Sequence, residues 1–98
     1  MKSDFKSIVG GDTTVLVDFY ADWCGPCKTL SPILQQVKDE LGDTIKIVKV
    51  DVDKNPKLAK KYRVQGIPTM LLFKKGIQVW RQSGILQKKD LIQVITSH

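Results

Sequence analysis

The stretch Trp23-Cys24-Gly25-Pro26-Cys27 holds the only two cysteines of the chain and decides how the sequence around it folds. A β-branched and aromatic run, residues 14–20, comes just before it, and apolar residues at helical spacing follow it. The predicted order is therefore a buried strand, a short loop, the cysteine pair and a helix. This order puts the first sulfur at a helix N-terminus, where unpaired N–H groups and the helix dipole lower the pKa of a thiol.

The composition fits one compact domain over residues 1–98. The chain is 42% hydrophobic and has a formal net charge of +6. Its lysines are scattered and are not interleaved with aromatic residues, so the pattern argues against nucleic-acid binding. The opening Met1-Lys2-Ser3-Asp4 lacks a signal-peptide pattern, and no apolar run reaches the length of a membrane span. We therefore expect no membrane association and a cytoplasmic location.

The remaining sequence alternates between strand and helix patterns. Helices are expected near residues 3–9, after the cysteines, after Asn55-Pro56 and over 88–96. Strands are expected at 14–20, 45–52, 69–73 and 77–82, with Lys75-Gly76 as the turn of a hairpin. The first strand shows no alternation with polar residues, which is typical of a central strand covered on both faces. The prediction is an α/β fold, a four-stranded mixed sheet with helices on both faces.

These residues resemble the thioredoxin family over nearly the whole chain. The motifs that match in order and approximate spacing are residues 17–21 and 23–28, Pro32, residues 66–69 and Gly84. The resemblance implies the thioredoxin fold, with strand order 45–52, 14–20, 69–73, 77–82. The chain starts too late to contain the family's usual first strand, so strand 45–52 is expected at a sheet edge. It also has Tyr20 where the family often has tryptophan.

The resemblance implies a thiol–disulfide oxidoreductase that reduces protein disulfides. Cys24 would attack as the more exposed sulfur, and Cys27 would resolve the mixed disulfide, leaving an oxidised Cys24–Cys27 pair. Gly25-Pro26 between the sulfurs is the pair found in reducing members of the family. A zinc site is the competing use of two such cysteines, but it needs about four ligands and His98 is the only histidine. No metal is therefore expected.

Asp18 and Lys49 are the candidate proton-transfer residues. Asp18 lies in a run suited to complete burial, and burial raises the pKa of a carboxyl group. In the family, the matching acid takes the proton of the resolving cysteine. Lys49 matches the family's basic partner, although an ordinary edge-strand lysine explains it equally well.

Candidate substrate-binding residues surround the cysteine pair. By resemblance Pro68 is a cis-proline, which would bring the Ile67 backbone beside Cys24 so that a substrate chain pairs with it as a short strand. The complete set is Trp23, Gly25, Pro26, Gly66, Ile67, Pro68 and Gly84.

The resemblance also implies the partners of the protein. No bound cofactor is needed, because the cysteine pair is itself the redox group in electron transport and redox homeostasis. Partners would be disulfide-containing client proteins and a flavin-containing thioredoxin reductase that uses NADPH. A monomer is expected, with a dimer through strand 45–52 as the alternative. Two other functions remain open, namely a disulfide oxidant or isomerase and a non-catalytic binding module that serves as a subunit or clamp.

Overall fold

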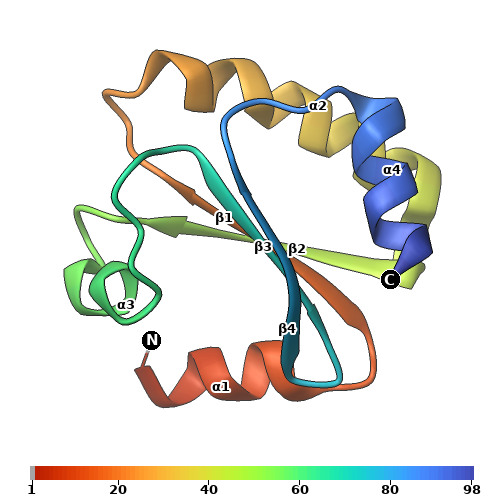
Figure 1. The fold of residues 1–98 in the computed structure, drawn as a ribbon, viewed down its shortest axis with the longest axis horizontal. Coiled ribbons are helices and arrows are strands. Elements are labelled where there is room, and N and C mark those ends of the chain that lie inside the picture. Colours follow the sequence, from red (N-terminus) through yellow and green to blue (C-terminus); the bar gives the residue numbers. More distant parts are fainter. Residues whose placement is uncertain (1) are drawn as a thin grey trace.

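The structure, a computed structural model, describes residues 2–98, with side chains from Phe5 onward. The elements, coloured from red to blue along the chain in Figure 1, are α1 (Lys2–Gly10), β1 (Thr14–Tyr20), α2 (Gly25–Leu41), the 3-10 turn η1 (Gly42–Thr44), β2 (Ile45–Asp51), α3 (Pro56–Lys61), β3 (Thr69–Lys74), β4 (Ile77–Ser83) and α4 (Lys88–Ser97). All the strands and helices predicted from the sequence are present. The strand boundaries differ from the predicted ones by one residue, at the C-terminal ends of β2, β3 and β4.

The four strands form one sheet in the order β2-β1-β3-β4, which confirms the predicted order. β1 runs parallel to β2 and antiparallel to β3, and β3 runs antiparallel to β4. The hairpin between β3 and β4 has positive φ at both central residues, 52° at Lys75 and 81° at Gly76. A two-residue turn of this kind matches the twist of the two strands, which is why the Lys-Gly pair closes the hairpin.

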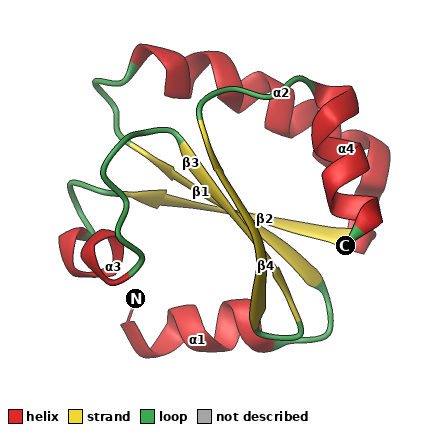
Figure 2. Ribbon diagram, viewed as in Figure 1, coloured by secondary structure: helices red, strands yellow, loops and turns green. Residues whose placement is uncertain are grey.

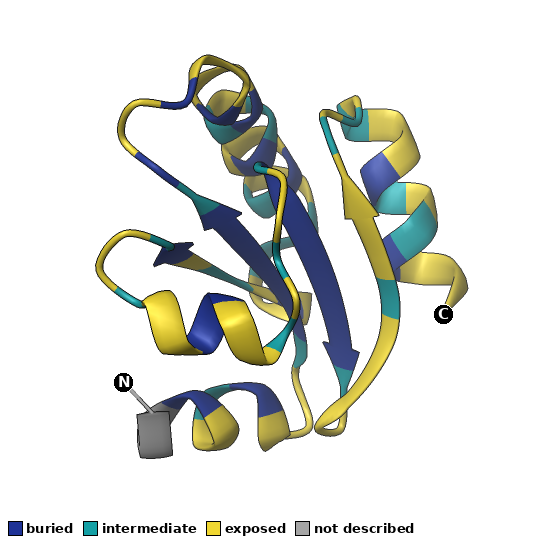
Figure 3. Cartoon of the chain, turned by 60° about the vertical axis from the view of Figure 1, so that its left-hand side comes forward, coloured by how far each residue is buried: buried dark blue, intermediate teal, exposed yellow. Residues whose placement is uncertain are grey.

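Helices cover both faces of the sheet, as predicted (Figure 2). α1 and α3 pack against one face of β1 through Val15, Val17 and Phe19, whereas α2 and α4 pack on the other face around Leu16. Because side chains alternate along a strand, one strand supplies both cores. Figure 3 shows the resulting contrast, with β1 and β3 buried and β4 largely exposed. This central position explains why β1 is apolar on both faces, with Asp18 as the exception.

β2 forms one edge of the sheet, as expected from the sequence. Lys46 and Lys49 on this strand are exposed, and charged residues at a sheet edge discourage pairing with another strand. Within residues 2–98, no helix is long and apolar enough to cross a membrane.

Candidate active site

Cys24 caps the N-terminus of α2, as the sequence predicts. Its backbone is extended (φ −89°, ψ 112°), and its Sγ accepts a hydrogen bond from the Cys27 N–H at 3.2 Å. Pro26 lies in the first turn, where a missing N–H costs no helical hydrogen bond. Cys24 and Cys27 are joined in a disulfide, with their Cα atoms 5.3 Å apart. The only two cysteines thus form one redox pair at a helix N-terminus.

The two cysteines are almost equally buried, with exposed fractions of 4% for Cys24 and 3% for Cys27. The structure therefore does not show the expected greater exposure of Cys24, because the two side chains have nearly the same exposed fraction. Both pack against Ala21, and a ring of partly buried residues closes around them, namely Tyr20, Val52 and Ile67. What distinguishes Cys24 is its surroundings, since its Sγ lies at the helix N-terminus and 3.8 Å from the Ile67 carbonyl oxygen.

The loop before β3 brings the Ile67 backbone to Cys24. The Ile67-Pro68 peptide bond is cis, as the resemblance predicts. Two hydrogen bonds fix this loop, one from the Gly84 N–H to the Pro68 carbonyl at 2.9 Å and one from Thr69 Oγ1 to the Gly66 carbonyl at 2.5 Å. The loop of residues 66–68 thus meets the Cys24 sulfur through Ile67 and is joined to Gly84 through Pro68.

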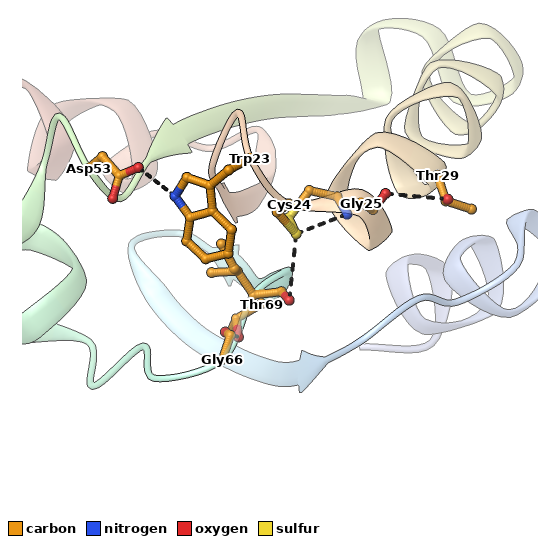
Figure 4. Close-up of a disulfide and its surroundings, with 9 residues drawn as sticks. Trp23, Cys24, Gly25, Thr29, Asp53, Gly66 and Thr69 are labelled. Atoms are coloured by element: carbon orange, nitrogen blue, oxygen red, sulfur yellow. Dashed lines mark hydrogen bonds between the residues drawn. A yellow bond between two sulfur atoms is a disulfide. The ribbon is translucent and has the colours of Figure 1, made fainter.

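Trp23 is the most exposed large apolar side chain of the site, with 71% of its surface accessible. Its Nε1 donates a hydrogen bond to Asp53 Oδ2 at 2.8 Å, and Figure 4 shows the indole held between Asp53 and Cys24. Sequence reasoning missed Asp53. The available signal was topological, because β1 and β2 are parallel and the loops that follow them leave the sheet at the same edge.

Asp18 is fully buried on β1. Neither of its carboxylate oxygens accepts a hydrogen bond from the part of the chain that the structure describes. Burial raises the pKa of Asp18 from 3.8 to about 6, and the positive charge of Lys49 opposes part of this rise. A carboxyl group with this pKa can both accept and release a proton near neutral pH.

Lys49 lies beside Asp18 in the register of β1 and β2 but bonds elsewhere. Its Nζ donates a hydrogen bond to Ser31 Oγ on α2 at 2.9 Å and lies 4.9 Å from the centre of the Tyr20 ring. The sequence did not reveal the contact with Ser31, because it depends on how α2 packs over β2.

Among the side chains that the structure describes, those of residues 5–98, no group of three or more His, Cys, Asp or Glu is arranged to hold a metal ion. The groups that the structure brings together at the site are the two sulfurs, the buried acid Asp18 and the backbone of the loop before β3. These groups suit thiol–disulfide exchange, in which two electrons and two protons pass from a dithiol to a disulfide.

Comparisons with known proteins agree with this site. The thioredoxin family model matches residues 1–97. A thioredoxin-like protein of Synechocystis sp. is 49% identical over 88 residues, which cover 90% of this chain and 84% of that protein. The thioredoxin of Rickettsia typhi is 46% identical over 92 residues, 93% of this chain and 88% of the relative. Mitochondrial thioredoxin 3 from Saccharomyces cerevisiae, solved in its oxidized form, has a TM-score of 0.89 at 32% identity, covering 99% of this chain and 90% of that one.

Proposed function

The chain belongs to the thioredoxin family and carries out dithiol–disulfide exchange through Cys24 and Cys27, and we propose that it acts as a reductant of client proteins. The observation that carries the proposal is the place of the Cys24 sulfur. It accepts an amide hydrogen bond at the start of α2 and lies beside the backbone of Ile67. An amide donor and the helix dipole stabilise a thiolate, which is the attacking form of cysteine.

The reaction begins with the reduced pair. The Cys24 thiolate attacks one sulfur of a client disulfide, a mixed disulfide forms, and the other client sulfur leaves as a thiolate. Cys27 then loses its proton to the Asp18 carboxylate and attacks Cys24 Sγ. The second client sulfur leaves as a thiolate, and the two client thiolates take up protons. The client has then been reduced by two electrons, and Cys24 and Cys27 have been oxidised to a disulfide. Lys49 assists by favouring the ionised form of Asp18.

The surface around Cys24 would bind the client chain. The backbone of Ile67 before Pro68 offers an edge on which an extended client segment pairs, and Trp23 and Gly84 flank it. Main-chain pairing reads little of the client's sequence, which suits a reductant that acts on many proteins. Gly25-Pro26 matches the reducing members of the family.

Clients and a recycling enzyme complete the proposed cycle. A thioredoxin reductase that draws electrons from NADPH would restore the dithiol. We propose a cytoplasmic location, where thiols are kept reduced, as the compartment in which such a cycle would run. We also propose a monomer, since the exposed Lys46 and Lys49 on the edge strand β2 discourage the pairing of two copies through that edge.

The first test is the reduction potential of the Cys24–Cys27 pair in a glutathione or dithiothreitol buffer. A reductant is expected near the value of about −270 mV that is typical of thioredoxins. A potential of about −180 to −120 mV would instead make the protein an isomerase or an oxidant.

A pair of variants tests the assignment of the two sulfurs. Cys24→Ser is expected to abolish the reduction of a disulfide-containing protein. Cys27→Ser, the matched control, is expected to keep the attacking sulfur and accumulate mixed disulfides, visible by mass spectrometry. A fully active Cys24→Ser protein would contradict the mechanism and favour a binding module.

A further inference from the structure

Two contacts hold the Lys49 ammonium group, and neither is with a carboxylate. Ser31 Oγ accepts a hydrogen bond from Lys49 Nζ at 2.9 Å, and the Tyr20 ring lies under the same nitrogen at 4.9 Å. The nearby Asp18 carboxylate has both oxygens buried and without a hydrogen-bond donor from the described residues. A lysine side chain loses conformational freedom when it is held in one position, so these two contacts restrict the ammonium group at a cost in side-chain entropy.

The geometry of the sheet explains why the two contacts matter for Asp18. Asp18 and Lys49 are partners in the register of β1 and β2. Asp18 and Tyr20 are two residues apart on β1, so both lie on the same face as Leu16, which α2 covers. Ser31 belongs to α2. The ammonium group is thus fixed from the helix above and the ring beside it, at the border of the site that contains Asp18.

We propose that Ser31 and Tyr20 are positioning residues that keep the Lys49 ammonium near the Asp18 carboxylate without letting the two groups pair. The inference rests on the proton-acceptor role of Asp18 in the proposed function. A direct ion pair would occupy the oxygens that must take the proton from Cys27. A lysine free in solvent would be screened and would favour the ionised carboxylate less. Held by Ser31 and Tyr20, the ammonium group is close enough to favour the ionised carboxylate but leaves the oxygens of Asp18 free to accept a proton.

Lys49 is the charged neighbour through which this arrangement acts. In the sheet, the other register partner of Asp18 is the uncharged Met70 on β3. Asp51 on β2 is the register partner of Tyr20 and lies two residues from Lys49 on the same face. Its Oδ1 accepts hydrogen bonds from the N–H groups of Asp53 and Lys54. The other groups at the site are Tyr20 and the two cysteines, which are joined in a disulfide. On the helices over this face, Lys38 bonds to the carbonyls of Gly42 and Ile45, Lys88 pairs with Glu40, and Lys28, Asp39, Lys89 and Asp90 are exposed.

The experiment is an NMR titration of the Asp18 side-chain carboxyl carbon in the oxidised protein. Ser31→Ala is expected to raise the pKa of Asp18, because the untethered ammonium moves into solvent. Lys49→Met is expected to raise this pKa further, because it removes the charge completely. Lys46→Met is the matched control, since it removes a lysine from the same strand on the opposite face, and it is expected to leave the pKa unchanged.

Conservative variants separate positioning from general damage to the site. Ser31→Thr keeps a hydroxyl and is expected to retain the parental pKa of Asp18. Tyr20→Phe keeps the ring and is also expected to retain it, whereas Tyr20→Leu is expected to raise it. In single-turnover exchange, Ser31→Ala is expected to slow resolution by Cys27 about twofold at pH 7 and not at pH 9, in keeping with the small effect of one exposed charge.

An unchanged Asp18 pKa in Ser31→Ala would overturn the inference, because the tether would then have no effect on the acid. A lowered pKa would overturn it too, since it would mean that Lys49 moves into contact with Asp18 when released. Either result, in a protein that still reduces disulfides, leaves the proposed function intact. Failure of the proposed function would appear separately, as a Cys24→Ser protein that remains fully active.

Discussion

Two buried aspartates on neighbouring strands have opposite surroundings. Asp51, at the end of β2, accepts hydrogen bonds at Oδ1 from the N–H groups of Asp53 and Lys54, at 2.9 and 3.3 Å. Asp18, on β1, is more completely buried and accepts none from the described residues. The bonded carboxylate shapes the turn that carries Asp53 toward Trp23. The unbonded one is free to exchange a proton, so the surroundings and not the residue type separate a structural acid from a chemical one.

The contrast has an energetic consequence. A buried carboxylate that accepts N–H bonds is compensated for the water it has lost, whereas one without donors favours its neutral form. The raised pKa of Asp18, about 6, expresses this difference. A fold keeps such an uncompensated group where its chemistry requires it. The comparison leads to three predictions.

The largest effect is expected on stability. Asp18→Asn should raise the free energy of unfolding at pH 7 by up to about 3 kcal/mol, because ionising Asp18 in the fold costs the difference between a pKa of 3.8 and one of about 6. Between these two values the folded protein holds the proton and the unfolded chain does not, so the parental protein loses stability as the pH rises. Denaturant unfolding of both oxidised proteins at pH 7 measures the gain.

The pH dependence provides the control for this prediction. Below about pH 4 both forms of the chain carry the proton, so the gain from Asp18→Asn should disappear there. An equal gain at pH 4 and pH 7 would show that the asparagine acts through packing and not through charge.

The second effect is on the rate of exchange. Asp18→Asn should slow the resolving attack of Cys27 about 100-fold at pH 7, because it removes the proton acceptor. The loss should shrink at alkaline pH, where a thiol ionises unaided. Single-turnover release of client thiols measures this step, and a rate like that of the parental protein at pH 7 would remove Asp18 from the mechanism.

The smallest effect on stability is expected from an Asp→Asn substitution at Asp51, on the neighbouring strand β2. Asp51→Asn should lower the free energy of unfolding by about 1 kcal/mol, because a neutral amide oxygen accepts the two N–H bonds less strongly than a carboxylate. Denaturant unfolding at pH 7 again measures it. If Asp18→Asn and Asp51→Asn changed the free energy of unfolding in the same direction, the comparison between the two acids would be wrong.

The sequence predicted the elements of the fold because each has a local pattern. The apolar run at 14–20, which does not alternate with polar residues, indicated a central strand, and Lys75-Gly76 indicated a hairpin. The strand order came only from the resemblance to a family, because pairing between distant strands leaves no local pattern. The helix N-terminus at Cys24 was also predicted, since the strand, loop and helix there are consecutive.

The parts of the site that were not predicted depend on contacts between distant residues. Asp53 reaches Trp23 across 30 residues, and Ser31 meets Lys49 across 18. Nothing in either local sequence marks these pairs. The near-equal burial of Cys24 and Cys27 likewise results from the loop at Ile67 and not from the spacing of the cysteines.

The short span of the disulfide has a consequence for repeated use. Cys24 and Cys27 are only three residues apart, so their bond closes a very small loop of the unfolded chain. The entropy lost in closing such a loop corresponds to about 2 kcal/mol, and the sheet and both of its cores lie outside it. Most of the stability is therefore independent of whether the bond is made. The cysteine pair can therefore be oxidised and reduced many times while the rest of the fold stays in place.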